Sequence, residues 1–210
     1  MSDTPSLEYQ LSTIPIEDIT YDIVEAFCNI GREEDIDLDY KSDWPDDFER
    51  ILAAFANTQG GIVIVGIEEI DKTRKPKSPP AGVIGNKDDL RQRVFNIGFD
   101  AIYPPVVPEV QVCPHPTATD RSIVVIRVQP SRLMHAVDHR SRIYIRSADN
   151  NRGYKLASIA DLEWLWEQRA KSDALATKLR KQQLYDLTAL QSLGKRNRLR
   201  NFGRMHHYFR

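Results

Sequence analysis

The segment AFANTQGGIVIVGIEE, residues 54–69, contains a helix end, two glycines, a strand and two acids within sixteen positions. Gly60 can take the left-handed backbone conformation that ends a helix, and Gly61 allows the chain to turn close to its neighbours before the strand begins. Residues 62–67 are apolar on both faces of the strand, which predicts a central place in a sheet. The acids directly behind this buried strand are the first candidates for chemistry.

The residues before this segment predict two helices and a strand. The nearer helix opens at Pro45, and its buried stripe recurs every three or four positions. The members of that stripe are Phe48, Ile51, Leu52 and Phe55. Over residues 36–41 apolar and charged side chains alternate, which is the two-residue period of a half-buried strand. An amphipathic helix is predicted over residues 16–30, where apolar residues have helical spacing.

The residues after this segment predict further strands and two helices. Apolar runs bounded by turn residues indicate strands over residues 81–85, 106–113, 122–128 and 142–147. Helical spacing of apolar residues indicates helices over residues 88–97 and 157–168. Because the order of helices and strands is mixed rather than strictly alternating, we expect an α+β fold with a mixed sheet and packed helices.

Length and composition indicate one globular domain with an appendage. The chain has 210 residues, of which 41% are hydrophobic and 28% charged. We expect a lead-in over residues 1–14, a domain over residues 15–168 and a basic helical tail over residues 169–210. No apolar run has the length of a membrane span, no leader pattern opens the chain and only two cysteines occur, so we expect a cytoplasmic protein with no membrane partner.

Charge is distributed unevenly along the chain. The tail holds eleven of the 29 Lys and Arg residues but only two of the 30 Asp and Glu residues. Clustered cations release counterions from a phosphate backbone on binding, so the tail indicates a polyanionic partner. The alternative is a solvated helix whose cations pair with acids of the domain or of a second copy of the chain.

Carboxylates near the two predicted strands are candidates for a metal site. On a regular strand Asp37, Asp39 and Lys41 point to the same side. The acids at residues 33–35 lie just before this strand, and those at residues 68–69 emerge near the same rim if the two strands pair. Clustered carboxylates stay ionised only beside a compensating cation, and oxygen ligands favour Mg²⁺ or Mn²⁺. From spacing alone, a solvated acidic rim is the simpler interpretation.

A longer pattern gives these acids a specific setting. Glu34 is followed by Asp39-Tyr40-Lys41, then by the block AFANTQGG with its apolar strand, and later by RIYIRS over residues 142–147. Together these features resemble the Schlafen AlbA-like (divergent AlbA) domain family over residues 15–168. The resemblance implies an α+β domain that acts on nucleic acid, with RNA favoured over DNA.

In the nucleolytic members of that family, three acids and a lysine form a metal-dependent ribonuclease site for tRNA-like substrates. The resemblance places catalytic roles on Glu34, Asp39, Lys41 and Glu69, with the three acids as ligands of Mg²⁺ or Mn²⁺ and Lys41 as the phosphate partner. Asp39 stands where the nuclease pattern has glutamate, and Glu69 stands where it has aspartate. Each difference moves a carboxylate by one methylene in a site that depends on close geometry.

Basic residues supply the expected nucleic-acid contacts. Those of the domain are Arg142, Arg146, Arg152 and Lys155. Those of the tail are Lys178, Arg180, Lys181, Lys195, Arg196 and Arg198. Nucleolytic Schlafens carry two such lobes in one chain, so a comparable groove here requires a homodimer. No second Cys/His pair joins Cys113 and His115, and no phosphate-binding loop is present, so we expect neither zinc nor a nucleotide cofactor.

Three functions follow from these patterns. The first is a metal-dependent RNA endonuclease built on the acids, and the second is a non-catalytic DNA- or RNA-binding module whose acids are structural. The third is a dimerisation or partner-docking protein that uses the leucines of its C-terminal helix. Cleavage that needs metal distinguishes the first, salt-sensitive binding without cleavage the second, and loss of self-association on removal of the tail the third.

Overall fold

The computed structural model describes residues 10–71, 73–137, 142–147, 153–175 and 177–182. The chain divides into two compact units, residues 1–160 and residues 161–210. The first unit holds the sheets and the helices that pack on them, and the described residues of the second unit are helical. Within the described ranges no helix is long and apolar enough to cross a membrane.

A five-stranded sheet forms the centre of the first unit. Its strands are β1 (Leu38–Lys41), β2 (Gly61–Val65), β5 (Val83–Ile84), β7 (Glu109–Pro114) and β8 (Arg121–Val128). β1 runs parallel to β2, whereas β8 is antiparallel to β2, β5 and β7. β2 therefore lies between β1 and β8, and the central place predicted for the apolar run over residues 62–67 is confirmed.

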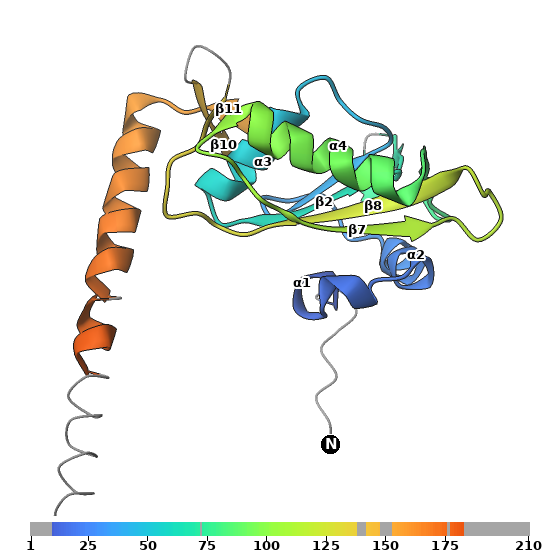
Figure 1. The fold of residues 1–210 in the computed structure, drawn as a ribbon, viewed down its shortest axis with the longest axis horizontal. Helices are drawn as coiled ribbons and strands as arrows, with labels where there is room; N and C mark the ends of the chain where they lie inside the picture. Colours follow the sequence, from blue (N-terminus) through green and yellow to red (C-terminus); the bar gives the residue numbers. More distant parts are fainter. Residues whose placement is uncertain (1–9, 72, 138–141, 148–152, 176, 183–210) are drawn as a thin grey trace, which may run out of the picture. The chain divides into compact units, whose positions relative to one another are not determined.

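Helices cover both faces of this sheet (Figure 1). They are α1 (Gln10–Thr13), the short 3-10 helix η2 (Ile16–Asp18), α2 (Tyr21–Ile30), α3 (Phe48–Asn57) and α4 (Lys87–Asp100). α3 and α4 lie on one face, and α1 and α2 lie on the other. Val63 and Val65 of β2 belong to the core with α3, while Ile62 and Ile64 belong to the core with α2. Since β2 has no solvent face, its sequence has no polar alternation.

A smaller four-stranded sheet packs against α3. In spatial order its strands are β11 (Tyr154–Leu156), β10 (Arg142–Arg146), β9 (Ala136–Val137) and β6 (Ile102–Tyr103). Asn57, buried at the end of α3, donates from Nδ2 to the carbonyl oxygens of His135 at 2.8 Å and Tyr144 at 3.0 Å. Its Oδ1 accepts from the amide of His135 at 2.8 Å. Because a buried amide needs such partners, Asn57 fixes β9 and β10 against α3.

The turn between α3 and β2 has the form that its glycines predicted. Gly60 has a φ of +75°, and its amide donates to the carbonyl oxygen of Phe55 at 2.9 Å, so the chain leaves the helix in a left-handed conformation. Gly61 begins β2 with a φ of +152° directly against the Phe55 ring. After β2, the chain forms the hairpin of β3 (Glu69–Ile70) and β4 (Lys75–Pro76).

The predicted α+β fold class is confirmed, and the differences lie in element ends and in short strands. The helix expected over residues 16–30 begins as α2 at Tyr21, after η2, because Thr20 accepts a hydrogen bond from the amide of Ile23 and caps the helix. Five strands were not predicted: β3, β4, β6, β9 and β11. Each has only two or three residues, so it carries no periodic pattern and depends on its tertiary pairing.

Candidate functional site

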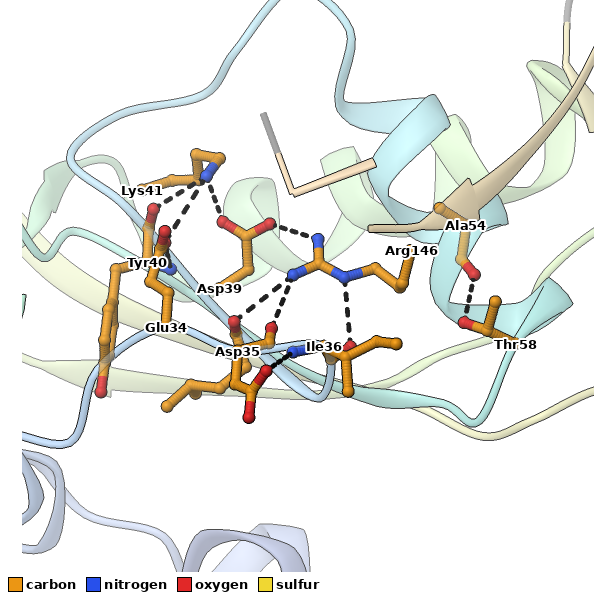
Figure 2. A network of polar contacts seen from close by, with 10 residues as sticks. Glu34, Asp35, Ile36, Asp39, Tyr40, Lys41, Ala54, Thr58 and Arg146 are labelled. Carbon is orange, nitrogen blue, oxygen red and sulfur yellow. Dashed lines mark hydrogen bonds and ion pairs between the residues drawn. The ribbon is translucent and has the colours of Figure 1, made fainter. Parts of the chain in front are cut away.

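Asp39 on β1 lies at the centre of a buried ion-pair network (Figure 2). Its side chain is 1% exposed. Oδ1 accepts a hydrogen bond from Nζ of Lys41, and Oδ2 accepts one from Nη1 of Arg146 at 2.7 Å. Two cations of the protein therefore compensate a single carboxylate in an interior where an unpaired charge is strongly unfavourable.

Arg146 reaches this network from the end of β10 and is itself 4% exposed. Its Nε donates to the carbonyl oxygen of Ile36 at 3.2 Å, and its Nη2 donates to those of Asp35 at 2.9 Å and Leu38 at 3.4 Å. The guanidinium carbon lies 4.2 Å from the centre of the Phe55 ring. One side chain thus connects β10 and α3 with the turn before β1.

Glu34 lies beside this network, on the segment that leads into β1. Its Oε1 accepts a hydrogen bond from the amide of Tyr40 at 2.5 Å and lies 3.9 Å from Nζ of Lys41. Burial, and next the charge of Asp39, raise the pKa of Glu34 from 4.5 to about 7, against the opposing effects of Lys41 and the Tyr40 amide. Near neutral pH both protonation states of Glu34 are therefore populated, as a general acid or base requires.

The two acids behind β2 differ in their surroundings. Glu69 opens β3 and is half-buried, and its charge contributes to the raised pKa of Glu34. Glu68 is 53% exposed and forms an ion pair with Lys77 at 2.7 Å. The fold consequently brings Glu34, Asp39 and Lys41 into one group, with Glu69 within electrostatic reach and Glu68 directed elsewhere.

Glu34 also opens onto a polar groove of the first unit. The groove is lined by Gly31, Arg32, Glu33, Glu34, Asp35, Arg74 and Lys75. Arg74 belongs to the β3–β4 hairpin, and its carbonyl oxygen accepts a hydrogen bond from the amide of Glu34 at 2.9 Å. The least buried carboxylate of the group therefore has access to solvent beside cationic side chains.

The predicted ligands of Mg²⁺ or Mn²⁺, namely Glu34, Asp39 and Glu69, do not fit an ion as the structure places them. Over the described ranges, no group of three or more His, Cys, Asp or Glu side chains is arranged to hold a metal. Each oxygen of Asp39 is already bonded to a cation of the protein. A divalent ion requires carboxylate oxygens directed at it from several ligands.

Comparison with known families matches residues 34–155 to the Schlafen AlbA_2 domain. The match covers more than half of the 210 residues. The chain belongs to the Schlafen AlbA_2 family. The resemblance drawn from the AFANTQGG block is thereby confirmed, and the matched range lies within the domain predicted over residues 15–168. A comparison with curated proteins gives no match.

Two solved structures are distantly similar to this AlbA_2 protein. One is the N-terminal domain of a Nitrosomonas europaea protein named for its relation to the ATP-dependent DNA helicase RecG, with 17% identity, a TM-score of 0.41, and coverage of 53% of this chain and 74% of that one. The other is the DIP2311 protein from Corynebacterium diphtheriae, with 21% identity, a TM-score of 0.43, and coverage of 70% of this chain and 30% of that one. Neither likeness assigns a function to this chain.

The cations predicted to contact nucleic acid from the AlbA_2 domain have different surroundings. Lys155 on β11 is exposed, and Arg142 on β10 is half-buried. Arg146 is not free to contact nucleic acid as expected, because its guanidinium is buried against Asp39 and three carbonyl groups. Arg152 lies outside the described residues.

The cations predicted in the tail lie partly on a described helix. Lys178, Arg180 and Lys181 are exposed there, as are the apolar side chains of Leu175 and Leu179. Three further predicted contacts lie outside the described residues: Lys195, Arg196 and Arg198. Nucleic-acid contact and dimerisation through this helix both stay predictions.

The pairing of Asp39 with Arg146 in this AlbA_2 domain is not predicted by the sequence patterns, which favour Asp39 as a metal ligand. The alternation over residues 36–41 is typical of a half-buried strand, and Arg146, which covers its charged side, comes 107 residues after Asp39 in the sequence. A carboxylate on a covered strand needs a cation. The pattern does not say which of the 29 Lys and Arg residues supplies it.

Glu34 is expected to make the stability of the AlbA_2 domain depend on pH. A carboxyl whose pKa rises from 4.5 to about 7 on folding contributes stability that is fully present below pH 4.5 and lost as the pH rises through 7. Between pH 5 and pH 8 we expect the free energy of unfolding to fall by about 2 kcal/mol. This value is smaller than the free energy that corresponds to the whole pKa difference, because Glu34 is partly solvated. Urea unfolding across this range measures it.

The Glu34→Gln variant, which keeps an oxygen that accepts the Tyr40 amide, is expected to remove this pH dependence. Glu33→Gln is the matched control, because Glu33 is 62% exposed and pairs at 3.6 Å with Lys75, which is 46% exposed. A Glu34→Gln protein with the wild-type slope between pH 5 and pH 8 would refute the assignment.

Proposed function

We propose that this AlbA_2 domain protein binds nucleic acid, with RNA favoured over DNA. The proposal rests on the uneven distribution of charge in this member of the Schlafen AlbA_2 family. The tail from residue 169 holds eleven Lys and Arg residues but only two acids. Lys178, Arg180 and Lys181 are exposed on its described helix. Such cations displace the counterions that are bound to the phosphates of a nucleic acid, so the affinity is expected to fall steeply with salt.

The binding experiment compares two variants that lose the same charge. Fluorescence anisotropy with a labelled structured tRNA and a matched DNA duplex is recorded at increasing salt, in the presence of chelator. In the first variant Lys178, Arg180 and Lys181 become serine. In the second the exposed cations of α4 become serine: Lys87, Arg91 and Arg93.

We expect the tail variant to bind at least about tenfold more weakly and to lose about two to three units of the salt slope. The α4 variant is expected to bind within about twofold of the wild type, since a net charge effect without local contacts is small at physiological salt. If both variants bind nucleic acid equally more weakly than the wild type, then the net charge of the protein, and not a binding surface on the tail, determines the affinity. No salt-sensitive binding to either nucleic acid would refute the proposal.

Cleavage of RNA at the acid group is a second candidate function. It is supported by Glu34, whose pKa is about 7, lying 3.9 Å from Nζ of Lys41 at the edge of a polar groove. In this arrangement Glu34 transfers a proton to or from a reacting oxygen, and Lys41 stabilises charge on the phosphate.

Cleavage is tested with tRNA and duplex DNA in Mn²⁺, Mg²⁺ or chelator. We expect Glu34→Gln to reduce RNA cleavage at least about 100-fold, the usual contribution of a general acid or base. Glu68→Gln is the control, because Glu68 is an exposed neighbour that pairs with Lys77 rather than with Lys41. Unchanged cleavage by Glu34→Gln, or no cleavage by the wild type under any condition, would leave only the binding function.

A further inference from the structure

The charges around Asp39 are compensated by the protein itself. Lys41 binds one carboxylate oxygen and Arg146 binds the other, and the exposed fractions of the Asp39 and Arg146 side chains are 1% and 2%. Lys41 also donates from Nζ to the carbonyl oxygen of Tyr40 at 3.0 Å. The cationic groups of Lys41 and Arg146 therefore lie where a bound cation would otherwise contact the Asp39 carboxylate.

We infer that Arg146 is the built-in counter-cation of this acid group. Arg146 lies in the place that a divalent ion would take, and it positions Asp39 and Glu34. The role of these acids in RNA cleavage rests on the proposed function, but the ion pairing is tested without RNA. The consequence is an AlbA_2 site that is assembled in the absence of Mg²⁺ or Mn²⁺.

The charges around Asp39 disfavour a further cation. A third cation on the carboxylate of Asp39 would lie beside two others in an interior with little water, where like charges repel strongly. Mg²⁺ also requires near-octahedral oxygen ligands and keeps several of its waters, for which a 1% exposed side chain leaves no room. Binding of such an ion therefore requires Arg146 or Lys41 to leave.

The geometry of the Arg146 side chain fixes the turn before β1. The planar guanidinium of Arg146 holds the carbonyl groups of Asp35, Ile36 and Leu38 while it binds Asp39, so one fork fixes the whole turn into β1. A lysine at this position has the charge but presents its donors from one atom, and so cannot reach all four partners. That turn sets the position of Glu34, whose Oε1 accepts the amide of Tyr40.

Gly153 leaves space for this guanidinium. Gly153 has a φ of +69°, and a Cβ there would lie 2.7 Å from Nη1 and 3.0 Å from Nη2 of Arg146. Its carbonyl oxygen accepts the amide of Ser147, the residue after β10. Glycine at this position therefore allows the chain to close over the charged fork.

A metal titration tests the charge argument on the wild-type protein. Mn²⁺ is added to ¹⁵N-labelled protein, and the paramagnetic broadening of amide signals is followed. We expect no saturable broadening at the amides of Glu34, Asp39, Lys41 and Glu69 at millimolar Mn²⁺. Saturable broadening at these amides that Glu34→Gln abolishes would overturn the inference, whether or not the protein binds RNA.

Hydrogen exchange tests the positioning argument with a variant that keeps every charge. Gly153→Ala displaces the guanidinium, and we expect exchange of the Tyr40 amide to accelerate at least about tenfold relative to the amide of Val63 in β2. Gly31→Ala is the control, because Gly31 has a φ of +71° but a Cβ there would come no closer than 4.0 Å to its nearest neighbour, Lys75.

The two amides distinguish positioning from general support. A purely structural role of Arg146 would accelerate Tyr40 and Val63 by the same factor in Gly153→Ala, which would overturn the positioning role. Arg146→Lys supplies a second comparison: if this variant retains wild-type protection of the Tyr40 amide, the positive charge alone suffices and the fork geometry has no part. Failure of RNA binding in the separate anisotropy experiment would affect neither result.

Discussion

Replacing Asp39 with alanine is expected to lower the free energy of unfolding by about 3–5 kcal/mol. The variant leaves Arg146, which is 4% exposed, without the carboxylate that balances its charge. The three carbonyl groups that also accept from Arg146 are dipoles and do not replace an anion. Equilibrium unfolding in urea, followed by circular dichroism, measures the loss.

Asp37→Ala is the matched control for this prediction. Asp37 lies two residues away and binds Arg32 with both oxygens at 2.7 Å, but the two side chains are 42% and 23% exposed. A solvated pair of this kind contributes less than about 1 kcal/mol, and we expect a loss of that size. Similar losses in the two variants, or a loss below about 1 kcal/mol for Asp39→Ala, would mean that the buried pair with Arg146 is not a major source of stability.

The contrast between Asp37 and Asp39 also marks how far the sequence predicts the site. Alternation over residues 36–41 correctly separates Leu38 and Tyr40, which belong to the core with α2, from Asp39 and Lys41 on the other side. Asp37 does not share that side as expected, because it lies in the turn before β1 and pairs with Arg32. The alternation cannot say whether the other side meets water or protein, because that depends on how α3 packs and on Arg146 of β10, which lies 107 residues after Asp39 in the sequence. The sequence around Arg146 likewise does not distinguish a strand cation that faces solvent from one that is buried.

The fold is predicted best where the pattern is local and long. The helices α2, α3 and α4 and the strands β2, β7 and β8 all show apolar periodicity or a continuous apolar run. The pairing of β1 with β2 in parallel, with Asp39 opposite Val63, is not encoded in either strand alone. It results from α3, which crosses between them, and from the glycine turn that returns the chain to the sheet.

Replacing Gly61 with alanine is expected to lower the free energy of unfolding by about 3–5 kcal/mol. A Cβ at this position would lie 2.4 Å from Cε1 of Phe55 and 2.5 Å from the carbonyl oxygen of Asp37. Phe55 is fully buried and stacks on Arg146, so the ring cannot move aside without disturbing the buried ion pair. The backbone φ of +152° adds conformational strain for any residue with a side chain.

The comparison with Gly31→Ala separates the steric clash at Gly61 from backbone strain. Gly31 ends α2 with a φ of +71°, but a Cβ there would be 4.0 Å from the nearest atom, so only the strain of about 1–2 kcal/mol is expected. Thermal and urea unfolding of both variants measure the difference. If Gly61→Ala loses no more than Gly31→Ala, then Phe55 can repack, and the close approach of α3 to β2 is not what fixes the position of Arg146 over the ring.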